Sequence, residues 1–358
     1  MELKNIYLQS KKYQIDINLN KQKKINYGLS ILKVILAFEV IAVHCFNSHS
    51  TNNQTILKLT YNRRIYVPCF LIISFNFMCH NLLSSNLKLF IQRLFRLLIP
   101  YIIWPIFIWV SNRLLHLKYN NKYSYSLQML KEQLLWGSNY MHQFWFQWNL
   151  IVITIFFFII IAIFSKHSLF ILHLILILTY ISQYSGYYYN NFFINYPKYN
   201  RYTIGRIFET VPLSVTGFTL GYFKIINLIS KCKIKTLIFS YIIYNVTNNY
   251  KIFTKIKGLG YNGISLNIQS IVVIFIFSLF PSEKIKNEFT KKLLILATNH
   301  TAGVYYLHFS VYQFFYNYLD DIKKGTFFGI IINYFICYII CFICLKIFGR
   351  TPFKYLFF

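Results

Sequence analysis

The sequence predicts an all-α protein, a polytopic membrane helix bundle of about ten transmembrane helices, and three observations lead to this fold class. Of the 358 residues, 56% are hydrophobic and only 13% are charged, whereas a soluble domain carries roughly 25% charged residues. The mean hydropathy is +0.45, and a soluble protein of this length could not bury so much apolar surface. The apolar residues also fall into long runs, which is typical of a protein that crosses a membrane.

Ten apolar segments approach the roughly 20 residues that an α-helix needs to cross a bilayer. Their approximate cores, in chain order, are Leu29–Phe46, Ile65–Leu83, Leu97–Trp109, Phe144–Phe164, Leu169–Ile181, Ile207–Phe223, Ile234–Tyr244, Ile264–Phe280, Leu293–Tyr318 and Phe327–Phe348. The third, fifth and seventh are short and could extend at either end. Residues 1–28 are polar and basic, so we interpret them as a cytosolic tail that precedes a transmembrane domain over residues 29–350.

The net charge of +28 reflects a large excess of Lys and Arg over Asp and Glu. Such an excess is typical of nucleic-acid-binding proteins, but here the basic residues form short clusters between apolar runs. That arrangement favours contact with anionic lipid headgroups, and we expect a lipid bilayer and no nucleic acid as partner. The larger share of Lys and Arg falls on the cytoplasmic side if both termini are cytoplasmic, so we expect a multi-pass protein of the cell membrane in that orientation.

We expect no metal site. Cys341 and Cys344 form a CxxC pair, but the pair lies inside a hydrophobic segment and lacks a second pair. We interpret both as small apolar packing residues.

The first predicted span contains three ionisable residues, Lys33, Glu39 and His44. Charged groups inside a membrane are costly and are therefore candidates for function. Eleven steps of about 100° bring Lys33 and His44 to one helix face, about 16 Å apart along the axis, while Glu39 lies about 240° round from Lys33. Lys33 could instead snorkel to the interface, and His44 could be a hydrogen-bonded helix contact. A buried neutral imidazole is also a suitable general base.

Arg93 and Arg96 lie at the start of the third span with the spacing that places both on one helix face. Guanidinium groups are permanently charged forks that suit phosphate or carboxylate oxygens. They could serve as headgroup anchors, or they could converge with Lys33 on one anionic ligand at the inner membrane surface.

Weaker signals come from later segments. Trp145 opens the fourth span and belongs either to an interfacial aromatic belt or to a site. Arg206 and Glu209 flank the start of the sixth span and could pair with each other. His308, in the ninth span, is either a helix-packing residue or a site residue.

Together these residues resemble the membrane acyltransferase-3 family, multi-span O-acyltransferases that modify bacterial surface glycans. The first span of that family carries a basic residue, ten intervening residues and a histidine, which Lys33 and His44 match. Lysine stands here where arginine is commoner, which keeps the charge and loses the bidentate fork. The family's Arg-x-x-Arg, followed by Leu and Pro, is matched by Arg93-Leu-Phe-Arg96-Leu-Leu-Ile-Pro100.

Three further motifs carry the resemblance along the chain. The Pro-x-Phe and Ser-Gly pattern of the second span is echoed by Pro68-Cys-Phe70 and Ser74, with Phe75 in place of the glycine, which leaves the packing of this helix open. The Trp-Phe of the middle span resembles Trp145-Phe146. The Gly-x-Tyr-Leu-x-His near the end is approximated by Tyr305-Tyr306-Leu307-His308.

The resemblance implies an acyltransferase that moves an acyl group, usually acetyl, from cytosolic acyl-CoA to a hydroxyl of a surface or lipid-linked glycan. Acetyl-CoA or another acyl-CoA would be a co-substrate, with no tightly bound cofactor. The catalytic residues would be His44, as general base, and Lys33. The substrate-binding residues would be Arg93, Arg96, Glu39, Trp145 and His308. Because we recognise no soluble domain, a separate extracytoplasmic partner could complete the transfer.

Two other readings stay open at this point. A transporter or flippase of a polysaccharide or lipid-linked intermediate would also carry charged residues inside a helix bundle, although the repeat symmetry common in transporters is missing. A catalytically decayed relative is a further possibility, given Lys33 and Phe75, while intact Arg93, Arg96 and His44 argue against decay.

Overall fold

The computed structural model describes residues 26–45, 65–114, 118–119, 123–124, 126–137, 141, 143–185, 199–229, 233–249, 263–280, 285–318 and 327–348. Most of the predicted basic tail, residues 1–25, lies outside this part, and residues 27 and 28 already belong to the first helix.

The elements are α2 (Tyr27–Cys45), α4 (Tyr66–Leu83), α5 (Leu87–Leu114), β1 (Lys118–Tyr119), β2 (Tyr123–Ser124), α6 (Leu127–Trp136), α7 (Phe144–Phe164), the 3₁₀ turn η1 (Ser165–His167), α8 (Ser168–Tyr184), α10 (Tyr199–Tyr222), α11 (Ile225–Ile229), α12 (Lys233–Asn249), α13 (Ile264–Ser278), α14 (Glu288–Tyr318) and α15 (Phe327–Phe348).

The predicted helical fold class is confirmed for the described residues, apart from the two-residue strands β1 and β2, which pair antiparallel. Each of the ten predicted spans falls on a helix. By length and composition, five segments of the described residues could cross a membrane: Tyr27–His44, Tyr66–Leu83, Leu87–Leu114, Phe144–Tyr184 and Phe328–Ile347. The predicted number of ten spans is therefore not confirmed. The chain is thus a helical membrane protein.

Helix α10 is too polar to be counted among the five candidate spans, although several of its polar side chains are buried. Glu209, Thr210 and Ser214 are all buried, and the hydroxyls of Thr210 and Ser214 donate to backbone carbonyls one turn earlier. The polar groups that lower the hydropathy of α10 therefore face protein.

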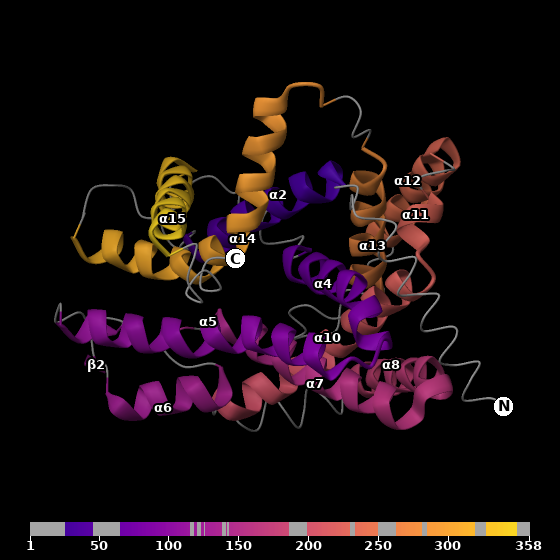
Figure 1. Ribbon diagram of the computed structural model, residues 1–358, viewed down its shortest axis with the longest axis horizontal. Coiled ribbons are helices and arrows are strands. Elements are labelled where there is room, and N and C mark those ends of the chain that lie inside the picture. Colours follow the sequence, from indigo (N-terminus) through magenta and orange to yellow (C-terminus); the bar gives the residue numbers. More distant parts are fainter. Residues whose placement is uncertain are drawn as a thin grey trace.

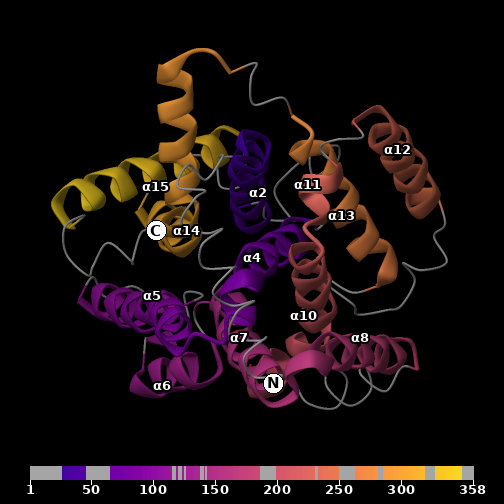
Figure 2. The same ribbon diagram turned by 45° about the vertical axis from the view of Figure 1, so that its right-hand side comes forward.

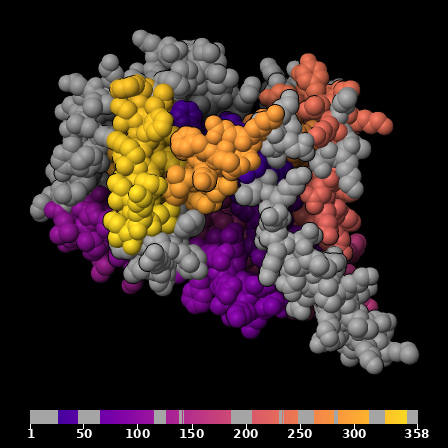
Figure 3. All heavy atoms as spheres, turned by 45° about the horizontal axis from the view of Figure 1, so that its top comes forward, coloured from indigo at the N-terminus to yellow at the C-terminus, as the bar shows by residue number. Residues whose placement is uncertain are grey.

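Helices α2 and α4 form the centre of the bundle (Figure 2). Helix α4 packs against α10, α13, α2 and α7, and α2 packs against α14, α13 and α15. Both central helices bury apolar residues at helical spacing, as expected for helices with protein on several sides. On one face of the molecule α15 lies beside α14 (Figure 3). The hydroxyl of Tyr334 on α15 donates to the Val34 carbonyl of α2, and that of Tyr338 donates to the Ala297 carbonyl of α14.

The contact between α4 and α10 depends on two glycines spaced four apart, Gly217 and Gly221. A Cβ atom on Gly217 would lie 2.3 Å from the Ile72 carbonyl oxygen, and one on Gly221 would lie 2.5 Å from that of Asn76. Small residues at this spacing let helix backbones approach closely, and van der Waals packing of this kind drives helix association in lipid. Phe75, whose packing the sequence left open, is fully buried on α4, and its ring lies 5.0 Å from that of Phe157 on α7.

Helix α5 contains Pro100 and Pro105. Since proline has no backbone N–H, Pro100 leaves the Arg96 carbonyl without its usual helical donor, and its ring crowds the preceding turn. The neighbouring Leu97 carbonyl accepts a hydrogen bond of 2.9 Å from the Gln147 side chain of α7. This bond ties α7 to α5 beside the two arginines.

Helix α14 is bent, and Figure 1 shows it as two arms at a pronounced angle. The Thr298 hydroxyl donates to the Leu294 carbonyl, and the Thr301 hydroxyl donates to the Thr298 carbonyl. Such hydroxyl-to-backbone bonds compete with the helical ladder and often bend helices. The residues that follow, up to His308, face the middle of the bundle.

Candidate active site

A cavity of about 700 Å³ opens between α2, α4, α5, α7 and α14. Three of its lining residues are cationic, namely Lys33, Arg93 and Arg96, and no Asp or Glu is among the lining residues in the described part of the chain. A cavity with three positive charges and no lining carboxylate is suited to an anionic ligand.

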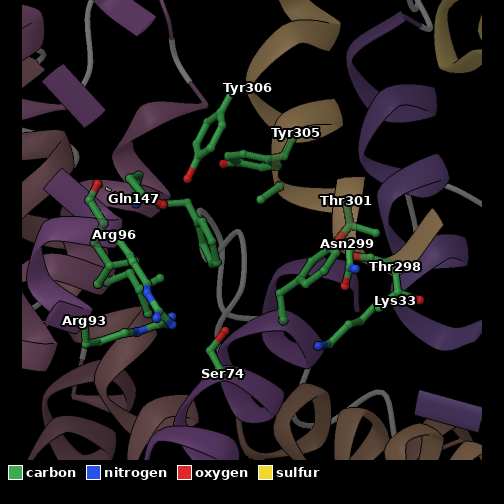
Figure 4. Close-up of a pocket in the computed structure, with 15 residues that line it drawn as sticks. Lys33, Ser74, Arg93, Arg96, Gln147, Thr298, Asn299, Thr301, Tyr305 and Tyr306 are labelled. Atoms are coloured by element: carbon green, nitrogen blue, oxygen red, sulfur yellow. Dashed lines mark hydrogen bonds between the residues drawn. The ribbon is translucent and has the colours of Figure 1, made fainter. Parts of the chain in front are cut away.

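The three cations approach the cavity from two sides (Figure 4). Arg93 and Arg96 project from α5, while Lys33 projects from α2 on the opposite side, with Ser74 of α4 between them. The Lys33 ammonium lies 5.1 Å from the centre of the Phe77 ring. The Nε atom of Arg93 is buried and makes no hydrogen bond within the described structure. The structure therefore brings together the three cations that sequence analysis singled out, and their roles stay predictions.

Helix α14 lines the cavity with uncharged polar side chains that the sequence did not assign to the site. They are Thr298, Asn299, Thr301, Tyr305 and Tyr306. A signal was present in the sequence, because residues 298, 301 and 305 are polar at helical spacing inside a predicted span. Gln147 of α7 was also missed. It carries no charge, and only the tertiary structure brings its side chain to the Leu97 carbonyl.

Two tyrosines of α14 separate the cavity from the bundle core. The Tyr305 hydroxyl donates a 2.5 Å hydrogen bond to the Gln143 carbonyl at the start of α7. The Tyr306 ring stacks on Phe144 with 5.6 Å between ring centres. Arg93 and Tyr306 are close enough to interact electrostatically. Both tyrosine rings are therefore held in place, and Figure 4 shows their hydroxyls at the cavity.

His44 and His308 form a pair directly behind Tyr305. Their ring centres are 5.1 Å apart, and the Tyr305 ring lies 5.8 Å from that of His308. His308 is fully buried, and its Nδ1 lies 2.7 Å from the Tyr305 carbonyl oxygen. Neither imidazole lines the cavity itself. The two predicted histidines are thus in contact with each other, and His308 is separated from the cationic cavity by the Tyr305 side chain.

Glu39 and Trp145, which sequence analysis assigned to substrate binding, do not line the cavity. Glu39 lies on the side of α2 where it acts electrostatically on Cys69 of α4. The Arg206 guanidinium lies over the Trp145 ring at 5.1 Å and forms an ion pair with Glu209. The predicted pairing of Arg206 with Glu209 is confirmed. Trp145 contacts this buried pair, and its role in substrate binding stays a prediction.

The fold and cavity together define a helical membrane protein with a pair of contacting imidazoles near a cavity lined by three cations, an arrangement typical of an enzyme site. The sequence model of the acyltransferase-3 family, described as an acyltransferase domain, matches residues 26–356, and the chain belongs to that family. Because the match covers nearly the whole chain, the protein is an acyltransferase. No curated protein and no solved structure matched the chain.

Proposed function

We propose that the protein is a membrane O-acyltransferase that moves an acyl group, usually acetyl, from cytosolic acyl-CoA to a hydroxyl of a surface or lipid-linked glycan. One observation carries the proposal: Lys33, Arg93 and Arg96 line one cavity beside the histidine pair. Acyl-CoA joins a highly anionic phosphate end to a thioester end, so it requires positive charge at one end and a general base at the other.

The cationic cavity would bind the phosphates of the donor. The two guanidiniums of α5 supply fork-shaped donors, and Lys33 adds a point charge from the opposite side. Hydrogen bonds between ionised groups are about twice as strong as neutral ones. Acyl-CoA would act as a co-substrate, and the proposal includes no tightly bound cofactor.

His44 would act as the general base. It takes the proton of the acceptor hydroxyl while the hydroxyl oxygen attacks the thioester carbonyl carbon, so that a C–O bond forms. The C–S bond of the tetrahedral intermediate then breaks, and the imidazolium returns the proton to the departing thiolate. The products are an O-acyl ester and free CoA thiol, and His44 is neutral again.

The position of the cavity along its helices supports one orientation in the membrane. Lys33 and Arg93 each lie six residues after the start of their helices, so the first turns of α2 and α5 are at the same end of the bundle. We place this end, and both termini, on the cytoplasmic side of the cell membrane, where acyl-CoA is found. All ten predicted spans would cross the bilayer, the shorter and more polar ones being covered by neighbouring helices.

The acceptor would reach His44 from the other end of the bundle, because His44 lies at the end of α2 opposite its cytoplasmic start. Besides acyl-CoA, glycan and lipid, a separate extracytoplasmic protein could complete the transfer. Nucleic acid is not among the proposed partners.

Isotope-labelled acetyl-CoA supplied to membranes that contain the protein tests the proposal. Label is expected in glycan with the unchanged protein, and the His44→Ala variant should lose about 10²–10⁴-fold in rate. A matched control is Arg113→Gln, which changes an exposed arginine on the same helix as Arg93, away from the cavity. Unchanged acylation by His44→Ala would exclude this mechanism. Vectorial movement of glycan without label would favour a transporter, whereas the family match favours the enzyme.

A further inference from the structure

We propose that His308 is a positioning residue for His44, whose imidazole it orients by accepting a hydrogen bond at Nε2. The inference rests on the proposed function, since it gives the general base a partner. Sequence analysis left His308 between a packing residue and a substrate-binding residue, and the geometry points to a different role.

The protonation of His308 follows from its neighbour on the same helix. Nδ1 lies 2.7 Å from the Tyr305 carbonyl oxygen, and a carbonyl oxygen can only accept. Nδ1 must therefore carry the hydrogen. In a neutral imidazole the other nitrogen, Nε2, then has a lone pair and acts as an acceptor.

That acceptor has no hydrogen-bond partner among the described residues. His308 is 0% exposed, and Nε2 makes no hydrogen bond within the described structure. Buried polar atoms are nearly always hydrogen-bonded, so an unpaired one calls for a donor that binds at some stage of function.

The His44 ring is in a position to supply the donor. The ring centres are 5.1 Å apart with 40° between the ring planes, a separation at which a nitrogen of the His44 ring can donate to His308 Nε2 when the two atoms face each other. Catalytic hydrogen bonds are often long in unliganded enzymes and tighten when substrate binds. The carboxylate on the same helix, Glu39, projects about 140° away from His44 and is not placed to orient it.

During catalysis, the second ring nitrogen of His44 needs a hydrogen-bond acceptor. When one nitrogen of His44 takes the acceptor proton, the other carries N–H and needs an acceptor. His308 Nε2 fills that role, as a carboxylate does in a Ser-His-Asp triad, by fixing the tautomer and stabilising the imidazolium. Because His308 Nδ1–H is held by a backbone carbonyl, its ring cannot turn to present the wrong nitrogen.

Two substitutions at this position separate positioning from packing. His308→Phe keeps a ring but removes the acceptor, and kcat should fall about 10²-fold or more with the KM for acyl-CoA unchanged. His308→Gln keeps an acceptor near the place of Nε2 and should recover at least 10-fold of that loss. The matched control is Asn333→Leu, because the Asn333 side chain donates to the backbone carbonyl of His308. Its kcat per folded protein should stay near the unchanged value.

The proposal is overturned if His308→Phe keeps kcat, if it changes only the KM for acyl-CoA, or if Gln is no better than Phe. A double variant tests the coupling even if the single variants are less stable. On the His44→Ala background, His308→Phe should cause no further loss of the residual rate, and an additive loss contradicts action through His44. Failure of the proposed function is separate, since in that case His44→Ala itself keeps full acylation.

Discussion

A Cβ atom on Gly217 would lie 2.3 Å from the carbonyl oxygen of Ile72, so α10 and α4 touch backbone to backbone. Helix α4 also supplies Ser74 to the cavity, two residues beyond this contact. The close approach of the two helices therefore helps to hold α4, and with it Ser74, in place at the cavity.

We expect Gly217→Ala to separate the two helices, because the added methyl group meets backbone that cannot move aside. Overpacking of this kind costs about 1–3 kcal/mol of folding free energy. Thermal unfolding in detergent should show a clear drop in Tm. Ile238→Ala is the control, since Ile238 is 57% exposed on α12 and its loss should change stability little. Equal Tm values for the two variants would contradict the contact.

The buried ion pair between Arg206 and Glu209 gives a second prediction. Arg206→Met leaves the Glu209 carboxylate buried at 1% exposure without its cation, which typically costs about 3–5 kcal/mol. The double variant Arg206→Met/Glu209→Leu removes both charges and should recover most of the loss. Thermal unfolding of Arg206→Met, Glu209→Leu and the double variant measures this coupling. A double variant as unstable as the sum of the single variants would show that the charges do not stabilise each other.

Lys33 gives a third prediction, which concerns donor affinity. Lys33→Met removes one of three cations from the cavity and should raise the KM for acyl-CoA about 10–100-fold, the value of one charged hydrogen bond. Lys33→Arg keeps the charge and should bind the donor at least as well. Steady-state kinetics at several acyl-CoA concentrations checks both. Lys88→Met is the control, because Lys88 is exposed near the start of α5 and does not line the cavity. If Lys33→Met has the KM of the control, Lys33 does not bind the donor.

Phe75 gives a fourth prediction, because it stands where the family pattern has glycine. Its side chain is fully buried and its ring lies 5.0 Å from that of Phe157. Phe75→Ala should therefore cost about 3–5 kcal/mol by leaving a cavity. Phe77→Ala, on the same helix at 55% exposure, is the matched control and should cost far less stability. A stabilised Phe75→Ala protein would mean that glycine is still the better residue here.

Much of the helix content was predictable from the chain, because a bilayer requires long apolar segments and each of the ten predicted segments is a helix. The number of membrane spans was harder to predict, since five of the described segments are long and apolar enough to cross a membrane. Helix α10 shows why, since its Glu209 and Thr210 lower the hydropathy of a segment whose polar groups are covered by protein. Hydropathy measures composition and does not tell which neighbour covers a polar side chain.

The sequence alone determined that the chain belongs in a membrane and that Lys33 and His44 share one face of the first helix, because helical periodicity is a local property. It also indicated two arginines on one face of α5. Only the tertiary structure decided that α14 brings Tyr305 and His308 to that face, and that Glu39 and Trp145 lie elsewhere. The physical reason is that lipid provides little hydrophobic drive to pair particular helices. Their pairing is decided by close backbone contacts, such as that of Gly217 with Ile72, between segments far apart in the chain.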